Sequence, residues 1–489
     1  MKKSILNKLT NFYLFLMIVV YPLLVGAKGY ENILEVKYYS FIIMSVSYFF
    51  ISIIIYFYYL IIKQNNLLKG LKLTKMDYLV LIFLLINVIS TIMSPYKSMN
   101  LLKGLGRGEG LLITTIYVLN YFFISKLGKF GKSILKYFSI SSIIVSLIAI
   151  IQFWGLNPLN LYKGISGPYN MSYMTTIGNI DFLSAFYVIT ISMSSLCYIF
   201  KENTLKENIL YIISLIVSLF IFLLINVDSG KVAFLSLIII VFPYILKNNK
   251  RLSKFINIIS MVIFGYFLNY FVDMRLFNSG IYKASWHFNY ISLGLLISIL
   301  FLLFIGYLLN KKEFNLKSVN KVYYLYIPLF IIGIIILYNC DFGISFLKDF
   351  KEILHGNFDD NLGNYRLFLW KRAVILFKDY PLIGTGPDSF AMRFMTKFTP
   401  DLANLGEISI NDTAANVYLT NLVNIGLFGL ISYLFMIIYP ILTKRSNIEN
   451  KIIILVLIAF YIQNLFNLSI VIITPYLYIL LGLLNIEKT

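Results

Sequence analysis

The sequence predicts an all-α membrane protein: a polytopic bundle of about 12–14 transmembrane helices, with one large extracytoplasmic loop that contains an interfacial helix. Of its 489 residues, 59% are hydrophobic and only 13% are charged, whereas soluble domains carry roughly 25% charged residues. Long apolar runs recur along the chain and exceed the length of a barrel strand. Lipid offers no partner to a backbone N–H or C=O, so we expect each run to be a helix.

The apolar runs are separated by short polar connectors. The first of them resembles a signal peptide, but the spans that follow favour a retained helix. The last two form the weakest pair, because Asn464 and Asn467 are compatible with a re-entrant turn. We expect helices near residues 11–27, 38–62, 77–94, 109–125, 134–153, 179–200, 208–227, 232–246, 255–272, 288–310, 322–339, 416–442, 452–466 and 468–485.

Lysine and arginine are distributed unequally between the two sets of connectors. One set, which includes both ends of the chain, holds 25 of the 42 basic residues. Short basic loops remain on the cytoplasmic side of a membrane. We therefore expect a multi-pass protein of the cytoplasmic membrane, with both termini cytoplasmic and the 340–415 loop facing outward. The net charge of +20 is better explained by topology and anionic lipid headgroups than by nucleic acid.

Three regions follow from this topology: transmembrane helices over 1–339, the functional loop over 340–415, and C-terminal transmembrane helices over 416–489. Within the loop, 365–378 has helical length and ends before Pro381, whose ring disfavours helix in the residue before it. Apolar residues alternate there with basic ones, which is typical of a helix lying at the interface. Cys197 and Cys340 lie far apart, so we expect neither a disulfide framework nor a zinc site.

Several polar residues of the predicted outward connectors have two interpretations. Arg366 can hold a phosphate through two hydrogen bonds, or can anchor its helix by snorkelling. Lys231 either faces the bundle as part of a substrate site or reaches external water. Arg107 is either a second cation for a diphosphate or one half of a local ion pair with Glu109, a capping acid. We interpret Lys371 and Arg372 as headgroup contacts.

Other motifs have simpler explanations. Asn179 is expected to cap the helix that follows it, with Asp181 in its first turn. Gly384-Thr385-Gly386 lacks the pattern of a nucleotide-binding loop and is expected to be a tight turn. Gly426 and Gly429 are expected to form a helix-packing face.

Together these residues resemble the bacterial O-antigen ligase and O-antigen polymerase family. The resemblance is strongest over 364–429 and weaker at Gly104 to Gly110, Ile177-Gly178-Asn179 and Ser229-Gly230-Lys231. The residues that carry it are Arg366, Trp370, Pro381 to Gly386, Asp412, Asn416-Val417-Tyr418-Leu419 and Gly426 to Gly429.

The resemblance implies a membrane glycosyltransferase that moves a glycan from a polyprenyl-diphosphate carrier to an acceptor hydroxyl on a glycan, lipid or protein. It implies no metal and no cofactor. The implied catalytic positions are Arg366, Asp412 and Ala415. Implied substrate contacts are Arg107, Lys231, Arg366, Asn416 and Tyr418.

One position departs from the family pattern. Ala415 stands where the family has a histidine that assists the acceptor hydroxyl, and alanine cannot accept a proton. Three alternatives remain: a base among Asp412, Asp388 and Glu407; slow deprotonation by water; or a family member that has lost activity. A lipid-linked glycan flippase is the rival from another class, although flippases usually have related halves and helices broken at the midplane.

Overall fold

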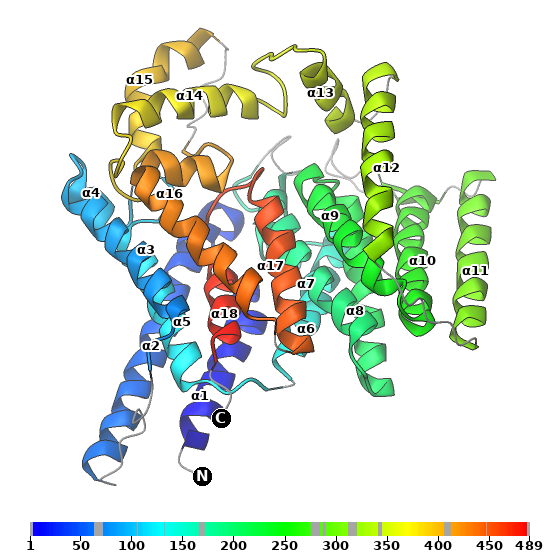
Figure 1. The fold of residues 1–489 in the computed structure, drawn as a ribbon, viewed down its shortest axis with the longest axis horizontal. Coiled ribbons are helices and arrows are strands. Elements are labelled where there is room, and N and C mark those ends of the chain that lie inside the picture. The colour runs from blue at the N-terminus through cyan, green and yellow to red at the C-terminus, as the bar shows by residue number, and fades with distance from the viewer. Residues whose placement is uncertain are drawn as a thin grey trace.

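The computed structural model describes residues 3–62, 72–104, 106–131, 133–165, 172–274, 284–286, 290–311, 320–340, 345–404, 412–445 and 447–486. The described chain is a bundle of helices (Figure 1). Two short antiparallel pairs join it, β1 (Tyr173–Met174) with β2 (Gly178–Asn179) and β3 (Val272–Met274) with β4 (Ala284–Trp286).

Helices follow one another along the whole chain. The N-terminal part contains α1 (Lys3–Phe15), α2 (Ile33–Ile61), α3 (Lys75–Ile92), α4 (Lys97–Leu101), α5 (Leu111–Leu127), α6 (Ile134–Phe153), α7 (Ile180–Phe200), α8 (Leu205–Leu224) and α9 (Asp228–Ile245). The C-terminal part contains α10 (Asn249–Phe271), α11 (Tyr290–Lys311), α12 (Asn320–Asn339), α13 (Ser345–Leu354), α14 (Arg366–Asp379), α15 (Phe390–Asn404), α16 (Val417–Thr443), α17 (Ile448–Gln463) and α18 (Thr474–Leu484).

The predicted all-α membrane bundle is confirmed. Every apolar run expected from the sequence falls on a helix, and ten helices of the described residues are long and apolar enough to cross a membrane. Several others, such as α5 and α18, are apolar but shorter. The two chain ends lie together at one end of the bundle, and α14 and α15 lie across the other (Figure 1).

Helix α7 lies at the centre of the bundle. All its residues from Phe182 to Ile199 are buried, because α6, α8, α9 and α17 pack around it. Its side chains include many serines and threonines, which allow close packing between membrane helices. Asn179 caps the helix as expected, accepting from the backbone N–H of Asp181 at 2.8 Å. The first turn of α7 is therefore held firmly at the end of the bundle covered by α14.

The first apolar span is not a regular α-helix over its whole length. Helix α1 continues into a π-helical turn (Leu16–Val20) and a 3-10 turn (Tyr21–Leu23), and a second 3-10 turn (Gly29–Asn32) precedes α2. Lys37 of α2 is fully buried and donates to the carbonyls of Tyr21 and Pro22 at 2.8 and 2.7 Å. These carbonyls end the first span, so the lysine satisfies acceptors that the helix itself leaves free.

Helix α16 is broken at Gly426, which corrects the prediction of a helix-packing face there. Gly426 has φ +68°, and a Cβ at this position would meet backbone atoms of Leu382 and Ile383 at 2.4 Å. The turn that begins at Pro381 inserts into the break: Thr385 N–H donates to Asn424, and Leu427 N–H donates to Pro381. Glycine is needed because the two backbones touch.

The Gly384-Thr385-Gly386 segment is the tight turn that was expected, with φ +66° and +97° at its glycines. Ser94 and Asn100 donate to the carbonyl of Thr385. The turn therefore joins the end of α3 to the break in α16.

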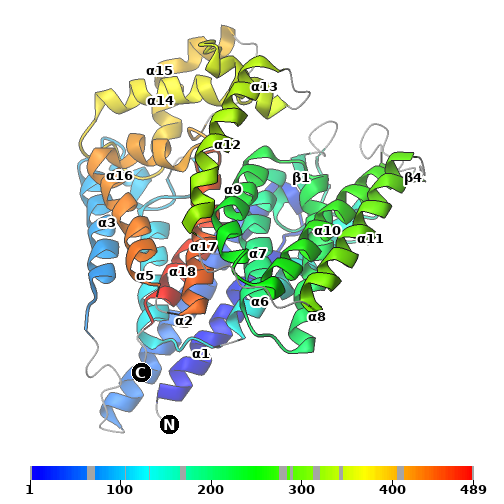
Figure 2. The ribbon, with the colours of Figure 1, turned by 45° about the vertical axis from the view of Figure 1, so that its right-hand side comes forward.

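The helices of the 340–415 region cover the end of the bundle opposite the termini (Figure 2). Helix α14 has the extent expected for 365–378. Its buried side chains, Phe368, Leu369, Ala373 and Leu376, pack with Phe390 and Phe394 of α15 and with Val423 of α16 in a separate small core. The sequence predicted α14, but it did not separate α13 and α15 from the rest of this region.

Candidate functional site

Arg366 is the first residue of α14. Gly363, Asn364 and Tyr365 before it all have positive φ, between +56° and +66°, so the chain turns sharply into the helix. Its Nη1 donates to the carbonyl of Gly363 at 3.1 Å. Its Nε is buried and has no hydrogen-bond partner within the described chain. The guanidinium interacts electrostatically with Asp181 in the first turn of α7.

Arg107 reaches the same turn of α7 from the glycine-rich loop before α5. Its guanidinium lies over the ring of Phe182, 5.9 Å from the centroid, and its Nε is 2.5 Å from Oδ2 of Asp412. The expected local pair with Glu109 is therefore wrong, because the acid that pairs with Arg107 comes from the distant loop. Arg366 and Arg107 thus approach neighbouring residues of α7, Asp181 and Phe182. Their role in a shared anion site stays a prediction.

Asp388 anchors the loop region to the glycine-rich loop. Its carboxylate accepts from the backbone N–H groups of Gly106, Arg107, Gly108 and Glu109 at 3.0 to 3.3 Å. Burial nevertheless raises the pKa of Asp388 to about 6. A Cβ on Gly104 or Gly106 would strike this carboxylate at 2.4 or 2.7 Å. The glycines are therefore needed to hold an acid, and this carboxylate is already occupied by structural contacts.

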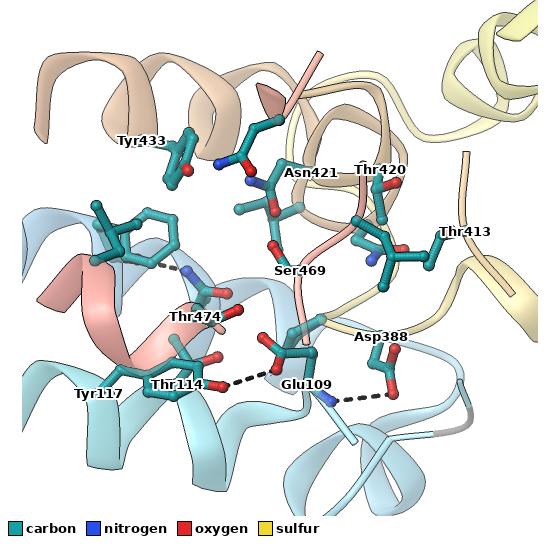
Figure 3. Close-up of a pocket in the computed structure, with 18 of the residues that line it drawn as sticks. Glu109, Thr114, Tyr117, Asp388, Thr413, Thr420, Asn421, Tyr433, Ser469 and Thr474 are labelled. Atoms are coloured by element: carbon teal, nitrogen blue, oxygen red, sulfur yellow. Dashed lines mark hydrogen bonds between the residues drawn. The ribbon is translucent and has the colours of Figure 1, made fainter. Parts of the chain in front are cut away.

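Glu109 is half-buried and lines a polar pocket of about 70 Å³ (Figure 3). Tyr117 donates to its Oε1 at 2.7 Å. Burial, opposed by this hydrogen bond and reinforced by nearby Asp388, raises the pKa of Glu109 to about 8. A water needs roughly 10–15 Å³ of such space, so the pocket has room for a few waters. Its polar walls include Asn87, Thr114, Thr413, Thr420, Asn421, Asn424, Asn464 and Ser469.

Lys231 lies in the first turn of α9, where Asp228 to Lys231 are helical and not a connector. Its Nζ donates to Asp228 at 3.1 Å and to Asn226. The preceding Gly230 packs against Ser184 of α7, leaving no room for a Cβ. The backbone of Lys231 therefore lies close to the first turns of α7. Its ammonium group is bound by Asp228 of the same helix and by Asn226, which precedes that helix.

Ala415 lies in the short segment that enters α16. It has φ +47°, a region in which asparagine, aspartate and histidine are enriched among non-glycine residues. Trp370 of α14 donates its indole N–H to the carbonyl of Ala414 at 3.1 Å. Trp370 thus fixes the backbone next to Ala415.

Asn416 and Tyr418 have structural partners. Asn416 caps α16, accepting from the N–H groups of Tyr418 and Leu419 at 2.9 and 3.0 Å. The Tyr418 hydroxyl donates to the carbonyl of Tyr461 at 2.8 Å. Their roles as substrate contacts stay predictions.

Lys371 and Arg372 of α14 both pair with Asp360, at 2.7 Å each. This pairing within the loop gives them partners other than lipid headgroups. Of the acids named as alternative bases, Asp412 is paired with Arg107, and Glu407 lies outside the described residues.

Sequence reasoning missed Arg393 of α15. This side chain is only 5% exposed, donates to the carbonyls of Val423 and Leu376, and lies 3.4 Å from Asp379. It links α14, α15 and α16. The sequence did contain a signal for this role, because Arg393 lies between Phe390 and Phe394. An arginine on the apolar side of an amphipathic helix is rarely buried without a partner.

Comparison with known proteins agrees with this geometry. Residues 290–434 match the family model described as O-antigen ligase. This part of the chain, just under a third of its length, is therefore similar to the O-antigen ligase family. The match covers α11 to most of α16, and thus includes Arg366, the Pro381 turn, Asp412 and Ala415. No curated protein matches the chain. This similarity and the ten apolar helices support a multi-pass membrane protein with a glycan-transferring function in surface polysaccharide assembly.

Proposed function

We propose that this protein transfers a glycan from a polyprenyl diphosphate to an acceptor hydroxyl, at the outer face of the cytoplasmic membrane. The acceptor oxygen attacks the anomeric carbon, and the bond from that carbon to the diphosphate oxygen breaks. The diphosphate leaves with the electron pair, and the hydroxyl proton passes to a base or to water. Negative charge grows on the leaving diphosphate, so preorganised cations accelerate the step.

The observation that carries the proposal is the approach of Arg366 and Arg107 to the first turn of α7, through Asp181 and Phe182. Arg366 has N–H donors left over after its bond to Gly363. An arginine fork matches the geometry of a phosphate. Arg107 can share its charge between Asp412 and a ligand, and Lys231 adds a third cation from α9.

The polyprenyl chain needs an apolar path to these cations. A groove of about 460 Å³ between α3 and α16 supports such a path, because Ile383 of the Pro381 turn forms part of its wall. The other wall residues include Ile82, Ile86, Phe428 and Phe435. The groove is almost wholly apolar, which suits an isoprenoid chain.

The direct test is transfer of a labelled glycan from a polyprenyl-diphosphate donor by the purified protein in detergent. We expect Arg366→Ala to lower the rate by at least ~10²-fold, as removal of one preorganised donor does in other enzymes. Arg366→Lys should retain part of the activity, because it keeps the charge and loses the fork. Arg372→Ala is the matched control on the same helix and should stay near the wild-type rate. Undiminished transfer by Arg366→Ala removes Arg366 from the mechanism.

A lipid-linked glycan transporter is the second candidate, and one observation favours it. Helix α16 is broken at Gly426, and the chain between α17 and α18 is irregular although Ile470 to Ile473 are buried. Irregular backbone at membrane depth is typical of transporters. Transfer in detergent, with no membrane to cross, would exclude transport as the sole activity.

A further inference from the structure

A second groove lies at the end of the bundle that carries the chain termini, away from Arg366. It runs between the C-terminal ends of α7 and α9 and the N-terminal ends of α10 and α17. Its volume is about 610 Å³, several times that of the pocket beside Glu109. Apolar side chains form its wall: Ile240, Val241, Ile452, Ile454, Leu455 and Ile458.

Four basic residues surround this apolar wall: Lys247, Arg251, Arg445 and Lys451. Lys247 lies over the ring of Tyr244 and Arg251 over the ring of Phe200, at 5.2 Å in each case. Arg445 is fixed by its Nε, which donates to the carbonyl of Ile441 at 2.6 Å. Among the described residues, no acidic side chain lines the groove. The four cations therefore gather on one rim without a neutralising carboxylate in the groove.

We propose that this groove binds one anionic phospholipid from the membrane leaflet at this end, the leaflet that the distribution of basic residues predicts to be cytoplasmic. The headgroup phosphate would contact Lys247, Arg251, Arg445 and Lys451, and the acyl chains would lie along Ile240, Leu455 and Ile458. Basic pockets between membrane helices are known to hold such headgroups, and lysine and arginine donors suit a phosphate.

The charge of the groove and its position in the bundle both favour an anionic phospholipid over other lipids. A zwitterionic lipid would place a second positive charge among four cations. A polyprenyl-diphosphate donor is needed near Arg366, at the opposite end of the bundle. The apolar wall suits the acyl chains of an anionic phospholipid, and the basic residues suit its headgroup. In a membrane leaflet the headgroup lies at the surface and the acyl chains lie deeper, as these two parts of the groove require.

The experiment measures binding of fluorescent phosphatidylglycerol to the full-length protein in detergent, with phosphatidylcholine as the neutral probe. We expect wild type to prefer phosphatidylglycerol, and Lys247→Gln/Arg251→Gln to weaken it by ~25-fold, at about five-fold for each cation removed near a membrane surface. Leu455→Trp, which fills the groove and leaves the charges intact, should weaken both probes. Lys129→Gln/Lys206→Gln removes two exposed cations elsewhere at this end and should leave binding unchanged.

Equal binding of the two probes by wild type, or unchanged phosphatidylglycerol binding in Lys247→Gln/Arg251→Gln, would overturn the proposal. Displacement of phosphatidylglycerol by substoichiometric polyprenyl diphosphate would assign the groove to the donor and would also overturn it. The proposal does not depend on glycan transfer, so a transfer-dead Arg366→Ala protein should retain the phosphatidylglycerol preference.

Discussion

The two ends of the helix bundle differ in how completely their charged side chains are hydrogen-bonded. At the end that carries the termini, the carboxylate of Asp77 is fully buried and saturated. It accepts from Lys126 at 2.5 Å, Thr74 N–H at 2.6 Å, Tyr121 at 2.8 Å and Asn485 at 2.9 Å. These partners come from α3, α5 and the C-terminal segment, so the network fixes how those segments pack.

At the opposite end, Arg366 keeps a buried Nε without a partner in the described chain, and Glu109 has a single side-chain donor, Tyr117. Buried polar groups in proteins almost always have partners, so each one that lacks them needs an explanation. Saturation at Asp77 indicates a structural role. The missing hydrogen-bond partner of the Arg366 Nε indicates a place where a ligand can bind.

The largest effect expected from this contrast is a loss of stability in Asp77→Ala. Removing the fully buried acid leaves Lys126, whose side chain is only 12% exposed, without its charge partner. Breaking a buried pair in this way typically costs about 3–5 kcal/mol. Thermal unfolding in detergent should show the loss. The transfer rate per folded molecule should stay near that of wild type. If Asp77→Ala lost transfer activity at unchanged stability, Asp77 would have a functional role, and the proposed difference between the two ends would be wrong.

Ala415→His should raise transfer by ~10²-fold or more, within the range that a positioned general base supplies. The backbone at φ +47° accepts histidine without new strain, so stability should change little. Initial rates at saturating donor and acceptor measure the effect. Ala415→Asn, which suits the same backbone but is no base, is the control. No difference between His and Asn at this position would exclude the lost-base hypothesis.

The dependence of stability on pH sharpens the comparison further. The pKa of Glu109 in the folded protein, about 8, lies above its ordinary value of 4.5. The folded state therefore binds the proton of Glu109 more tightly than the unfolded state does. Its contribution to stability is fully present below about pH 4.5 and is lost as pH rises toward 8. Glu109→Gln should remove about 3–4 kcal/mol of the fall in stability between pH 5 and 8.

Unfolding temperatures of the full-length protein at pH 5, 6.5 and 8 measure this effect. The exposed acid Glu35, which lies 3.9 Å from Lys103, offers the matched control Glu35→Gln. If the unfolding temperatures of the wild type and both variants changed equally with pH, Glu109 would not be a protonated acid at neutral pH.

The sequence was sufficient for features with a local signal. Apolar runs predicted each span, because lipid forces such runs to be helical. Pro381 predicted the end of α14 to within two residues. Asn179 as a cap and Gly384-Thr385-Gly386 as a turn followed from the preferences of those residue types.

Features that depend on distant partners could not be predicted in the same way. Arg107 has an acid two positions away, yet it pairs with Asp412, because Glu109 accepts a hydrogen bond from Tyr117 instead. The glycine-rich loop binds the carboxylate of Asp388, some 280 positions later. Gly426 suits both a packing face and a break, and only the insertion of the Pro381 turn decides between them.

Binding of polyprenyl diphosphate without acceptor tests the central claim most directly, since it measures recognition apart from chemistry. We predict that Arg366→Ala weakens binding of the purified protein by at least ~10-fold, which is the loss expected for one hydrogen bond between charged groups. Arg372→Ala should bind as wild type does. Equal affinity of the wild type and Arg366→Ala proteins for the diphosphate would contradict the account.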